Sequence, residues 1–511
     1  MDSRTKNASR NVLSASAFQL VNIILKFALR TVFVYTLGKE YLGLNGVFSN
    51  ILSILSLSEL GIGSAIIYDM YKPIAEDDTD KVNSLLHFYR TIYAFIGTAI
   101  FVFGICLIPF LDYIITDVPG TVNIRLVYML YVINSSCSYF FAQYTSLVGA
   151  YQKNYIVTNI QMLFSIVKTA LEMLFLIFTR SYIVYLLVEI LISVSQNFAI
   201  KHKAVEFLPF LNNNCTKLAQ NEKKKIFRNA FSNFSIKISG AIINGTDNII
   251  MSAFVSTILV GIYSNYAMII QICQATTVMF MNAIAAGVGN ICANGSVEKK
   301  NEIFKRIDFF FETLYSIIGV GFIVTIEPFV SIWIGKEYIL PFSVEIVIIL
   351  NCIIVGFLQP FEIYVSADGL FRHFKVSSIM AAIINIIVSI VLALKLGVLG
   401  VLLGTTISQL VTKAWFYPYI VFKYSLKSSF AKYFAECIKK IALIIVITLI
   451  DKLAIELLLT ECGDVLQILF GGVFTVIIFG MIWSFFYYET PEYQYYKNMV
   501  QNIIRRQKVE K

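Results

Sequence analysis

Long apolar segments separated by short polar ones run along the whole chain. About twenty apolar residues in a helix, rising about 1.5 Å each, cross the hydrocarbon core of a bilayer. About fourteen segments are long enough; they cover residues 11–36, 43–70, 88–110, 124–149, 156–179, 183–200, 229–254, 258–291, 307–326, 343–367, 376–395, 398–422, 438–457 and 465–486. The pattern predicts an all-α polytopic membrane protein with about fourteen transmembrane helices.

The composition agrees with this class and excludes a soluble enzyme. Of the 511 residues, 58% are hydrophobic and 14% are charged, whereas about a quarter of the residues in soluble domains are charged. The basic excess, 41 Lys and Arg against 32 Asp and Glu, comes without an arginine-rich run, so we expect no nucleic-acid partner. The three histidines lie far apart and the eight cysteines lack metal-binding spacing. We therefore expect no metal centre, no cofactor and no enzyme activity.

The basic residues predict the orientation in the membrane. With a cytoplasmic N-terminus, about thirty Lys and Arg fall on the inner side and about six lie at or near the outer side. An even number of spans then places both termini in the cytoplasm. The basic tail from Tyr493 to Lys511 contains interspersed apolar residues, and we interpret it as a helix lying on the anionic membrane surface.

An internal repeat divides the chain. Residues 10–14 (RNVLS) match 228–232 (RNAFS), and 42–44 (LGL) match 260–262 (VGI), at a nearly constant offset of about 220 residues. Six spans in each half enter the membrane in the same sense, which predicts two lobes related by a pseudo-twofold axis along the membrane normal. We expect a six-helix lobe over 1–210, a second over 211–425, and an extra helix pair with a basic tail over 426–511.

Polar side chains form stripes along three of the expected spans. Because polar groups are costly in hydrocarbon, such stripes face water or protein. The stripe of the first span lies within an arc of about 100°; it contains Asn11, Gln19, Asn22, Lys26 and Arg30. Its repeat partner carries Asn229, Asn233, Lys237, Asn244, Asp247 and Asn248. The second span has a milder stripe of Asn45, Ser49, Ser53, Ser56, Glu59 and Gly63. We expect these stripes to line a cavity between the lobes.

The intramembrane charges have functional and structural interpretations. Lys26 and Arg30 bind an anion, or Arg30 snorkels to the outer interface while Lys26 pairs with an acid on a neighbouring helix. We favour the anion site, because no acidic residue of that span neutralises them. Asp247 either couples a cation or neutralises one such as Lys26. Lys168 and Glu172 have the i,i+4 spacing of an intrahelical ion pair. Both interpretations also remain open for Glu59, Glu189, Glu362 and Lys413.

Several stretches carry a family resemblance. Residues 30–33 (RTVF) through 37–44 (LGKEYLGL), followed by 59–65 (ELGIGSA), resemble the opening of Wzx-type polysaccharide flippases. Residues 332–338 (IWIGKEY) are similar to a recurrent segment of the same family. That family belongs to the multidrug/oligosaccharidyl-lipid/polysaccharide exporter (MOP) superfamily, and the last two spans resemble the extra helices of some members, including lipid II flippases.

The resemblance implies a function in the bacterial cytoplasmic membrane. Family members move an undecaprenyl-pyrophosphate-linked oligosaccharide to the outer leaflet by alternating access between two lobes, driven by an ion gradient or the membrane potential. Polysaccharide polymerase and glycosyltransferases are implied partners, beside membrane lipids. A pyrophosphate needs cations in a low-dielectric cavity, and a glycan needs uncharged hydrogen-bonding groups.

The expected site combines both kinds of group. The residues assigned to pyrophosphate and glycan are Lys26, Arg30, Lys237, Gln19, Asn22, Asn45, Asn233 and Asn244, and those assigned to ion coupling are Asp247 and Glu59. The alternatives are a multidrug/cation antiporter of the same superfamily, and a flippase for lipid II or another wall precursor. A membrane polymerase or ligase is disfavoured, since no large external loop carries catalytic residues.

Overall fold

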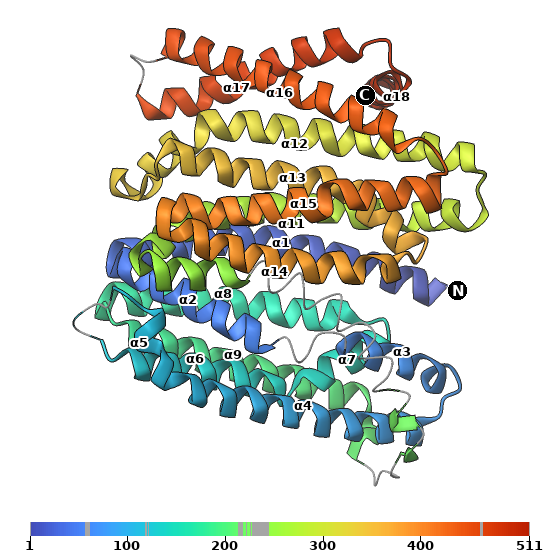
Figure 1. Cartoon of the computed structure of the whole chain (residues 1–511). Helices are drawn as coiled ribbons and strands as arrows, with labels where there is room; N and C mark the ends of the chain where they lie inside the picture. Colours follow the sequence, from blue (N-terminus) through green and yellow to red (C-terminus); the bar gives the residue numbers. More distant parts are fainter. Residues whose placement is uncertain are drawn as a thin grey trace. The chain divides into compact units, whose positions relative to one another are not determined.

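The computed structural model describes residues 2–56, 62–117, 120, 122–212, 218–220, 222–224, 226, 245–459 and 463–509. The regular secondary structure of these residues is helical (Figure 1), which confirms the all-α prediction. The chain forms two compact units, Met1–Ser264 and Asn265–Lys511. The division into lobes at residues 210 and 425 stays a prediction.

The first unit is built from helices that pack in pairs, some distant in the sequence and some consecutive. Within it, α1 packs along α8, α8 along α9, and α4 along α6. The elements are α1 (Asp2–Leu37), α2 (Lys39–Leu55), α3 (Ile62–Ala75), α4 (Thr79–Leu107), α5 (Leu111–Ile114), α6 (Ile124–Tyr139), α7 (Ala142–Ala150), α8 (Asn154–Thr179) and α9 (Tyr182–Phe207). A helical segment at 245–254 and the first turns of α11 (Thr257–Asn294) complete this unit.

The second unit contains the rest of α11 and the helices that follow it. α14 packs along α15, α12 contacts α13 and α17, and α16 lies against α12 and α17. The elements are α12 (Val297–Ile334), α13 (Phe342–Ala367), α14 (Phe371–Leu396), α15 (Val398–Val421), α16 (Phe430–Leu459), α17 (Asp464–Tyr487) and α18 (Pro491–Val509).

Ten helices of the described residues are long and apolar enough to cross a membrane, and they match ten of the expected spans. The other four differ for identifiable reasons. The span 43–70 is divided into α2 and α3, and 124–149 is divided into α6 and α7. The span 438–457 lies inside α16, where Asp451 and Lys452 interrupt the apolar run. Most of 229–254 lies outside the described residues.

Two glycines end membrane helices in the same way. Gly38 (φ 87°) separates α1 from α2, and Gly335 (φ 109°) follows the last residue of α12. Each begins a GKEY tetrapeptide, at 38–41 and at 335–338. Positive φ strains any residue with a Cβ, so glycine permits the change of direction at each helix end.

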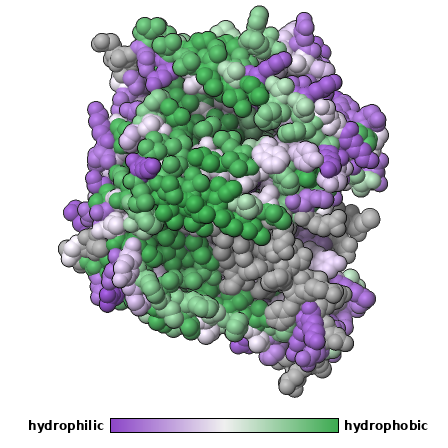
Figure 2. All heavy atoms as spheres, in the orientation of Figure 1, coloured by the Kyte–Doolittle hydropathy of each residue, from purple (hydrophilic) through white to green (hydrophobic). Residues whose placement is uncertain are grey.

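The exposed surface of the long helices is apolar, as contact with lipid requires. On the face shown in Figure 2, hydrophobic side chains cover the middle of the helices and hydrophilic ones lie toward their ends. In α16 and α17 the exposed side chains include Leu449, Leu453, Leu469 and Val473. In water this apolar area would aggregate, whereas hydrocarbon accommodates it without penalty.

The basic tail forms the helix α18, as the sequence predicts. The Tyr496 hydroxyl donates a 3.0 Å hydrogen bond to the carbonyl oxygen of Arg306, and the Arg306 guanidinium lies 4.0 Å from the ring centroid of Tyr495. Burial raises the pKa of Tyr496 to about 12. These contacts fix α18 against the beginning of α12.

Candidate functional site

Arg30 lies on α1 against the beginning of α11. Its Nη1 donates a 3.2 Å hydrogen bond to Ser264 Oγ, and Ser264 Oγ in turn donates to the carbonyl oxygen of Gly261 at 2.7 Å. Among the described residues, no carboxylate oxygen comes within 4.0 Å of a side-chain nitrogen of Arg30. Among the same residues, the bond to Ser264 uses one of the five guanidinium donors, which leaves the others available for a further acceptor.

Three tyrosines surround this arginine from α6 and α9. Tyr131 and Tyr182 share a hydrogen bond of 2.9 Å between their hydroxyl oxygens, and the rings of Tyr182 and Tyr185 stack with centroids 5.9 Å apart. Phe33, one turn from Arg30 on α1, packs edge-on against Tyr182 and Tyr185. The Asn45 side chain of α2 also hydrogen-bonds to Tyr182. Four helices thus converge on a buried phenolic cluster beside Arg30.

The polar stripes along the sequence did not indicate this tyrosine cluster. Aromatic residues in membrane proteins more commonly lie in interfacial belts, so their number alone does not indicate a binding site. Tyr182 and Tyr185 are three residues apart at the beginning of α9, so they share a helix face. That spacing could have indicated the pair from the sequence. Only the tertiary structure brings Tyr131 and Phe33 into contact with this face of α9.

Lys168 connects α8 to α9 through two carboxylates. Its Nζ lies 4.0 Å from Glu172 Oε1 and 3.7 Å from Glu189 Oε1. The pair with Glu172 was predicted from the i,i+4 spacing, and the contact with Glu189 was not. The Glu172 side chain is 0% exposed, and neither of its oxygens accepts a hydrogen bond among the described residues. One ammonium facing two carboxylates leaves this cluster one positive charge short.

The remaining polar residues of the α1 stripe have different environments. Lys26 is exposed, one turn before Arg30, while Gln19 and Asn22 are half-buried. Asn11 Nδ2 donates to the carbonyl oxygen of Gln152 at 3.0 Å, and the amide of Tyr155 donates to Asn11 Oδ1 at 2.7 Å. Asn11 therefore fastens the beginning of α1 to the beginning of α8 within the first unit.

The stripe of the second repeat is described only in part. Lys237, Asn233 and Asn244, and also Glu59 of the second span, lie outside the described residues. Asp247 is half-buried in the helical segment 245–254, and its charge acts on Tyr263 of α11. The roles assigned to all these residues stay predictions.

A polar latch joins the connection after α5 to the residues around the beginning of α11. The Thr116 amide donates to Thr257 Oγ1 at 3.1 Å, and Thr116 Oγ1 donates to the carbonyl oxygen of Ser252 at 3.1 Å. Ser256 Oγ donates to Asp117 Oδ2 at 2.5 Å. In the orientation predicted from the basic residues, this latch lies on the outer side of the membrane.

Glu362 and Lys413 form a further charge pair within the second unit. They lie on α13 and α15, and each side chain stabilises the charge of the other electrostatically. This arrangement supports the structural interpretation of the two residues, because each supplies the partner that an intramembrane charge requires.

The described helices have the fold of the MOP transporters. The structure resembles the lipid II flippase MurJ in an inward closed conformation, with a TM-score of 0.67 over 94% of this chain and 99% of that chain, at 14% sequence identity. It also resembles an inward-facing multidrug resistance MATE family transporter of the MOP superfamily, with a TM-score of 0.60 over 79% of this chain and 97% of that chain, at 13% identity.

A third solved structure, the Vibrio cholerae MATE transporter VcmN, matches with a TM-score of 0.56 over 83% of this chain and 99% of that chain, at 11% identity. The sequence matches no protein-family model and no curated protein. These similarities confirm the predicted polytopic architecture, and the resembling structures are transporters and a flippase.

Proposed function

We propose that this protein is a flippase in the bacterial cytoplasmic membrane, with both termini in the cytoplasm. Its substrate is an undecaprenyl-pyrophosphate-linked oligosaccharide, which it moves to the outer leaflet for capsule, exopolysaccharide or O-antigen-type polysaccharide synthesis. The cycle is alternating access between two lobes, driven by an ion gradient or the membrane potential. Glycosyltransferases supply the substrate and a polymerase consumes it.

The environment of Arg30 carries this proposal. The Arg30 guanidinium lies between helices, donates a hydrogen bond to the neutral Ser264 and is flanked by tyrosines. Among the described residues it forms no ion pair with a carboxylate. A pyrophosphate supplies the missing negative charge and matches the planar donors of the guanidinium. Phenolic hydroxyls and amide side chains suit the hydroxyl groups of a glycan.

The other assigned residues complete the site in this proposal. Lys26 and Lys237 add positive charge for the pyrophosphate, while Gln19, Asn22, Asn45, Asn233 and Asn244 bind the glycan. The polyprenyl tail stays in the bilayer, so only the polar head has to cross.

We assign ion coupling to carboxylates of the expected spans. Asp247 and Glu59 are the residues assigned from the sequence. The Lys168 cluster adds Glu172 as a further carrier, because a buried carboxyl without a hydrogen-bond donor favours its neutral, protonated form. A proton bound to Glu172 makes the cluster of Lys168, Glu172 and Glu189 electrically neutral.

A flippase for lipid II or another wall precursor is the second candidate. The MurJ structure covers 94% of this chain and the inward-facing MATE transporter covers 79%, which favours a lipid-linked substrate over a multidrug one. A cationic drug would also meet the positive charge of Arg30. Lipid II shares the polyprenyl pyrophosphate, and it differs from the primary substrate in the sugar.

Reconstitution in liposomes tests the proposal. A labelled polyprenyl-diphosphate sugar is placed in the inner leaflet of the liposomes. It becomes accessible to an external probe only if the protein moves its headgroup to the outer leaflet. We expect movement with the wild-type chain and its loss when Lys26→Ala and Arg30→Ala are combined; Lys6→Ala, on the same helix, is the control. Exchange of cationic drugs without movement of any such lipid contradicts the proposal and supports the antiporter.

A further inference from the structure

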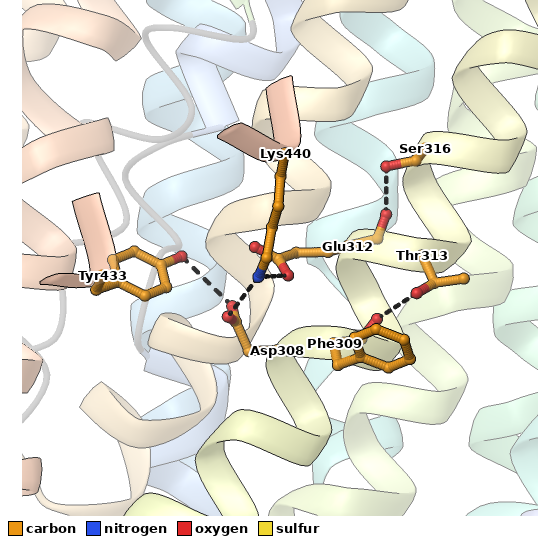
Figure 3. A network of polar contacts seen from close by, with 7 residues as sticks. All are labelled: Asp308, Phe309, Glu312, Thr313, Ser316, Tyr433 and Lys440. Carbon is orange, nitrogen blue, oxygen red and sulfur yellow. Dashed lines mark hydrogen bonds and ion pairs between the residues drawn. The ribbon is translucent and has the colours of Figure 1, made fainter. Parts of the chain in front are cut away.

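A second charged cluster lies in the unit Asn265–Lys511, where α16 packs on α12. Figure 3 shows the Lys440 ammonium between the carboxylates of Asp308 and Glu312, which lie one turn apart on α12. Lys440 Nζ donates a hydrogen bond to Glu312 Oε2 and lies 4.0 Å from Asp308 Oδ2. The Tyr433 hydroxyl donates to Asp308 Oδ1 at 3.4 Å. The two helices are thus joined by a four-residue network.

The network is buried, but one edge borders a cavity. The side chains of Lys440, Asp308 and Glu312 are 13%, 6% and 1% exposed. A cavity of about 790 Å³ is lined by Asp308, Tyr433 and Lys440, beside residues of α12, α16 and α18. The orientation predicted from the basic residues places this cavity on the cytoplasmic side. Asp308 is therefore withdrawn from bulk water yet reachable by protons from it.

The charges of the network do not balance. Two carboxylates face one ammonium, so the ionised cluster carries one negative charge, which is costly where water is excluded. The other charged residues that line the cavity are three acids and three bases, Glu298, Glu436, Glu492, Lys305, Lys432 and Lys439, and they cancel. Cys437 and Tyr487 also act on the cluster and are neutral as thiol and phenol.

The two carboxylates have different roles. Glu312 accepts the hydrogen bond of Lys440 at Oε2, which makes it the counter-ion of the ammonium, while its Oε1 has no hydrogen-bond partner among the described residues. Asp308 Oδ2 lies 4.0 Å from the ammonium, beyond hydrogen-bond distance, and Asp308 borders the cavity. A metal cation is disfavoured, because hard cations need several oxygen ligands and the ammonium repels them.

We propose that Asp308 binds one proton from the cytoplasmic cavity, while Glu312 remains the counter-ion of Lys440. A hydronium ion in the cavity gives up the proton and becomes water, and the carboxylate becomes a carboxylic acid, which makes the contact between α12 and α16 electrically neutral. Loss of the proton leaves a net negative charge in this contact and weakens it. The proton site does not depend on the proposed lipid substrate, since binding is measured without transport.

Infrared spectroscopy of the full chain in lipid tests the site directly. The carbonyl stretch of a protonated carboxylic acid is recorded while the bulk pH is varied. We expect the wild-type chain to show a buried carboxyl band that Asp308→Asn reduces by one carboxyl equivalent. Glu298→Gln is the matched control, because Glu298 lines the same cavity on the same helix but is exposed; it should leave the band unchanged.

A second variant keeps the test decisive if Asp308→Asn fails to fold. Lys440→Met removes the ammonium, so Glu312 must also become neutral, and the band assigned to this cluster should about double. An unchanged band in both Asp308→Asn and Lys440→Met overturns the proposal. Displacement of the band by added sodium at constant pH also overturns it, in favour of a sodium site. Lipid movement in liposomes is measured separately and tests only the flippase.

Discussion

Gly43 of α2 and Gly261 of α11 lie backbone to backbone. A Cβ added to Gly261 would stand 2.8 Å from the amide nitrogen of Gly43 and 2.2 Å from the carbonyl oxygen of Lys39. A Cβ added to Gly43 would stand 2.0 Å from the carbonyl oxygen of Thr257. The internal repeat aligns these same two glycines, so equivalent positions of the two halves form one close contact. Backbone atoms cannot move aside as a side chain can, and the approach therefore requires glycine on both helices.

Gly261→Ala should force α2 and the beginning of α11 apart. Overpacking costs about 1–3 kcal/mol, and we expect the variant to unfold at a lower temperature in detergent. The matched control is Gly287→Ala on the same helix, where no atom lies within 4 Å of the added Cβ. Equal thermal stability of the two variants would contradict the tight contact.

Arg30→Gln should reduce lipid movement by about tenfold or more, because a charge-assisted hydrogen bond contributes about 1.5–3 kcal/mol. Arg30→Lys keeps the charge but loses the planar pair of donors, so an intermediate rate is expected. The measurement is the initial rate of probe accessibility in liposomes. A normal rate for Arg30→Gln, at equal reconstitution, removes Arg30 from the pyrophosphate site.

Lys168→Met should destabilise the contact between α8 and α9, because it leaves Glu172 and Glu189 without their shared cation. Removal of one partner from a buried pair costs about 3–5 kcal/mol; the partial exposure of Lys168 lowers our expectation to about 1–3 kcal/mol. The double variant Lys168→Met with Glu172→Gln should recover part of the loss. Thermal unfolding of the three proteins decides this, and the absence of any recovery would argue against the shared ion pair.

The contact between Lys81 and Glu222 should respond to pH. Lys81 Nζ donates a 2.5 Å hydrogen bond to Glu222 Oε1, and this bond lowers the pKa of Glu222. A carboxyl with a lowered folded pKa stabilises the fold above its unfolded value of about 4.3 and loses that effect as the pH falls through the folded value. The effect is small, below about 1 kcal/mol, because both side chains are partly exposed.

Limited proteolysis near residue 222 measures this contact. Cleavage should be faster at pH 4 than at pH 7 relative to a distant site, with the protease chosen to work at both values. Glu222→Gln should remove the difference. A pH dependence that persists in this variant assigns the effect to another group.

The local pattern of residues predicted much of the fold. The length of the apolar segments predicted ten helices that the structure confirms as long and apolar enough to span a membrane. This prediction works because burial in hydrocarbon depends on local composition. The break between α6 and α7 was not predicted, since Phe140 and Phe141 at that point continue the apolar run. Where a helix bends or ends inside such a run depends on packing against its neighbours.

The candidate site could be predicted only in part. The polar stripe placed Arg30 on an inward-facing side of its helix, because periodicity is a local property. The partners of Arg30 come from α6, α9 and α11, more than a hundred residues away in the sequence. No residue spacing predicts these contacts. The same holds for Glu189, which meets Lys168 across two helices.

The sequence by itself determined that this chain is a multi-span membrane protein with few charges inside the bilayer, because hydrophobic length and charge position act locally. The tertiary structure decided which of those charges are balanced. Glu362 and Lys413 stabilise each other's charge, and Lys168 lies between two carboxylates. Lys440 lies between Asp308 and Glu312. Arg30 receives only neutral hydrogen-bond and aromatic neighbours among the described residues. The cost of a buried charge depends on its partners, and only the packing of distant helices supplies them.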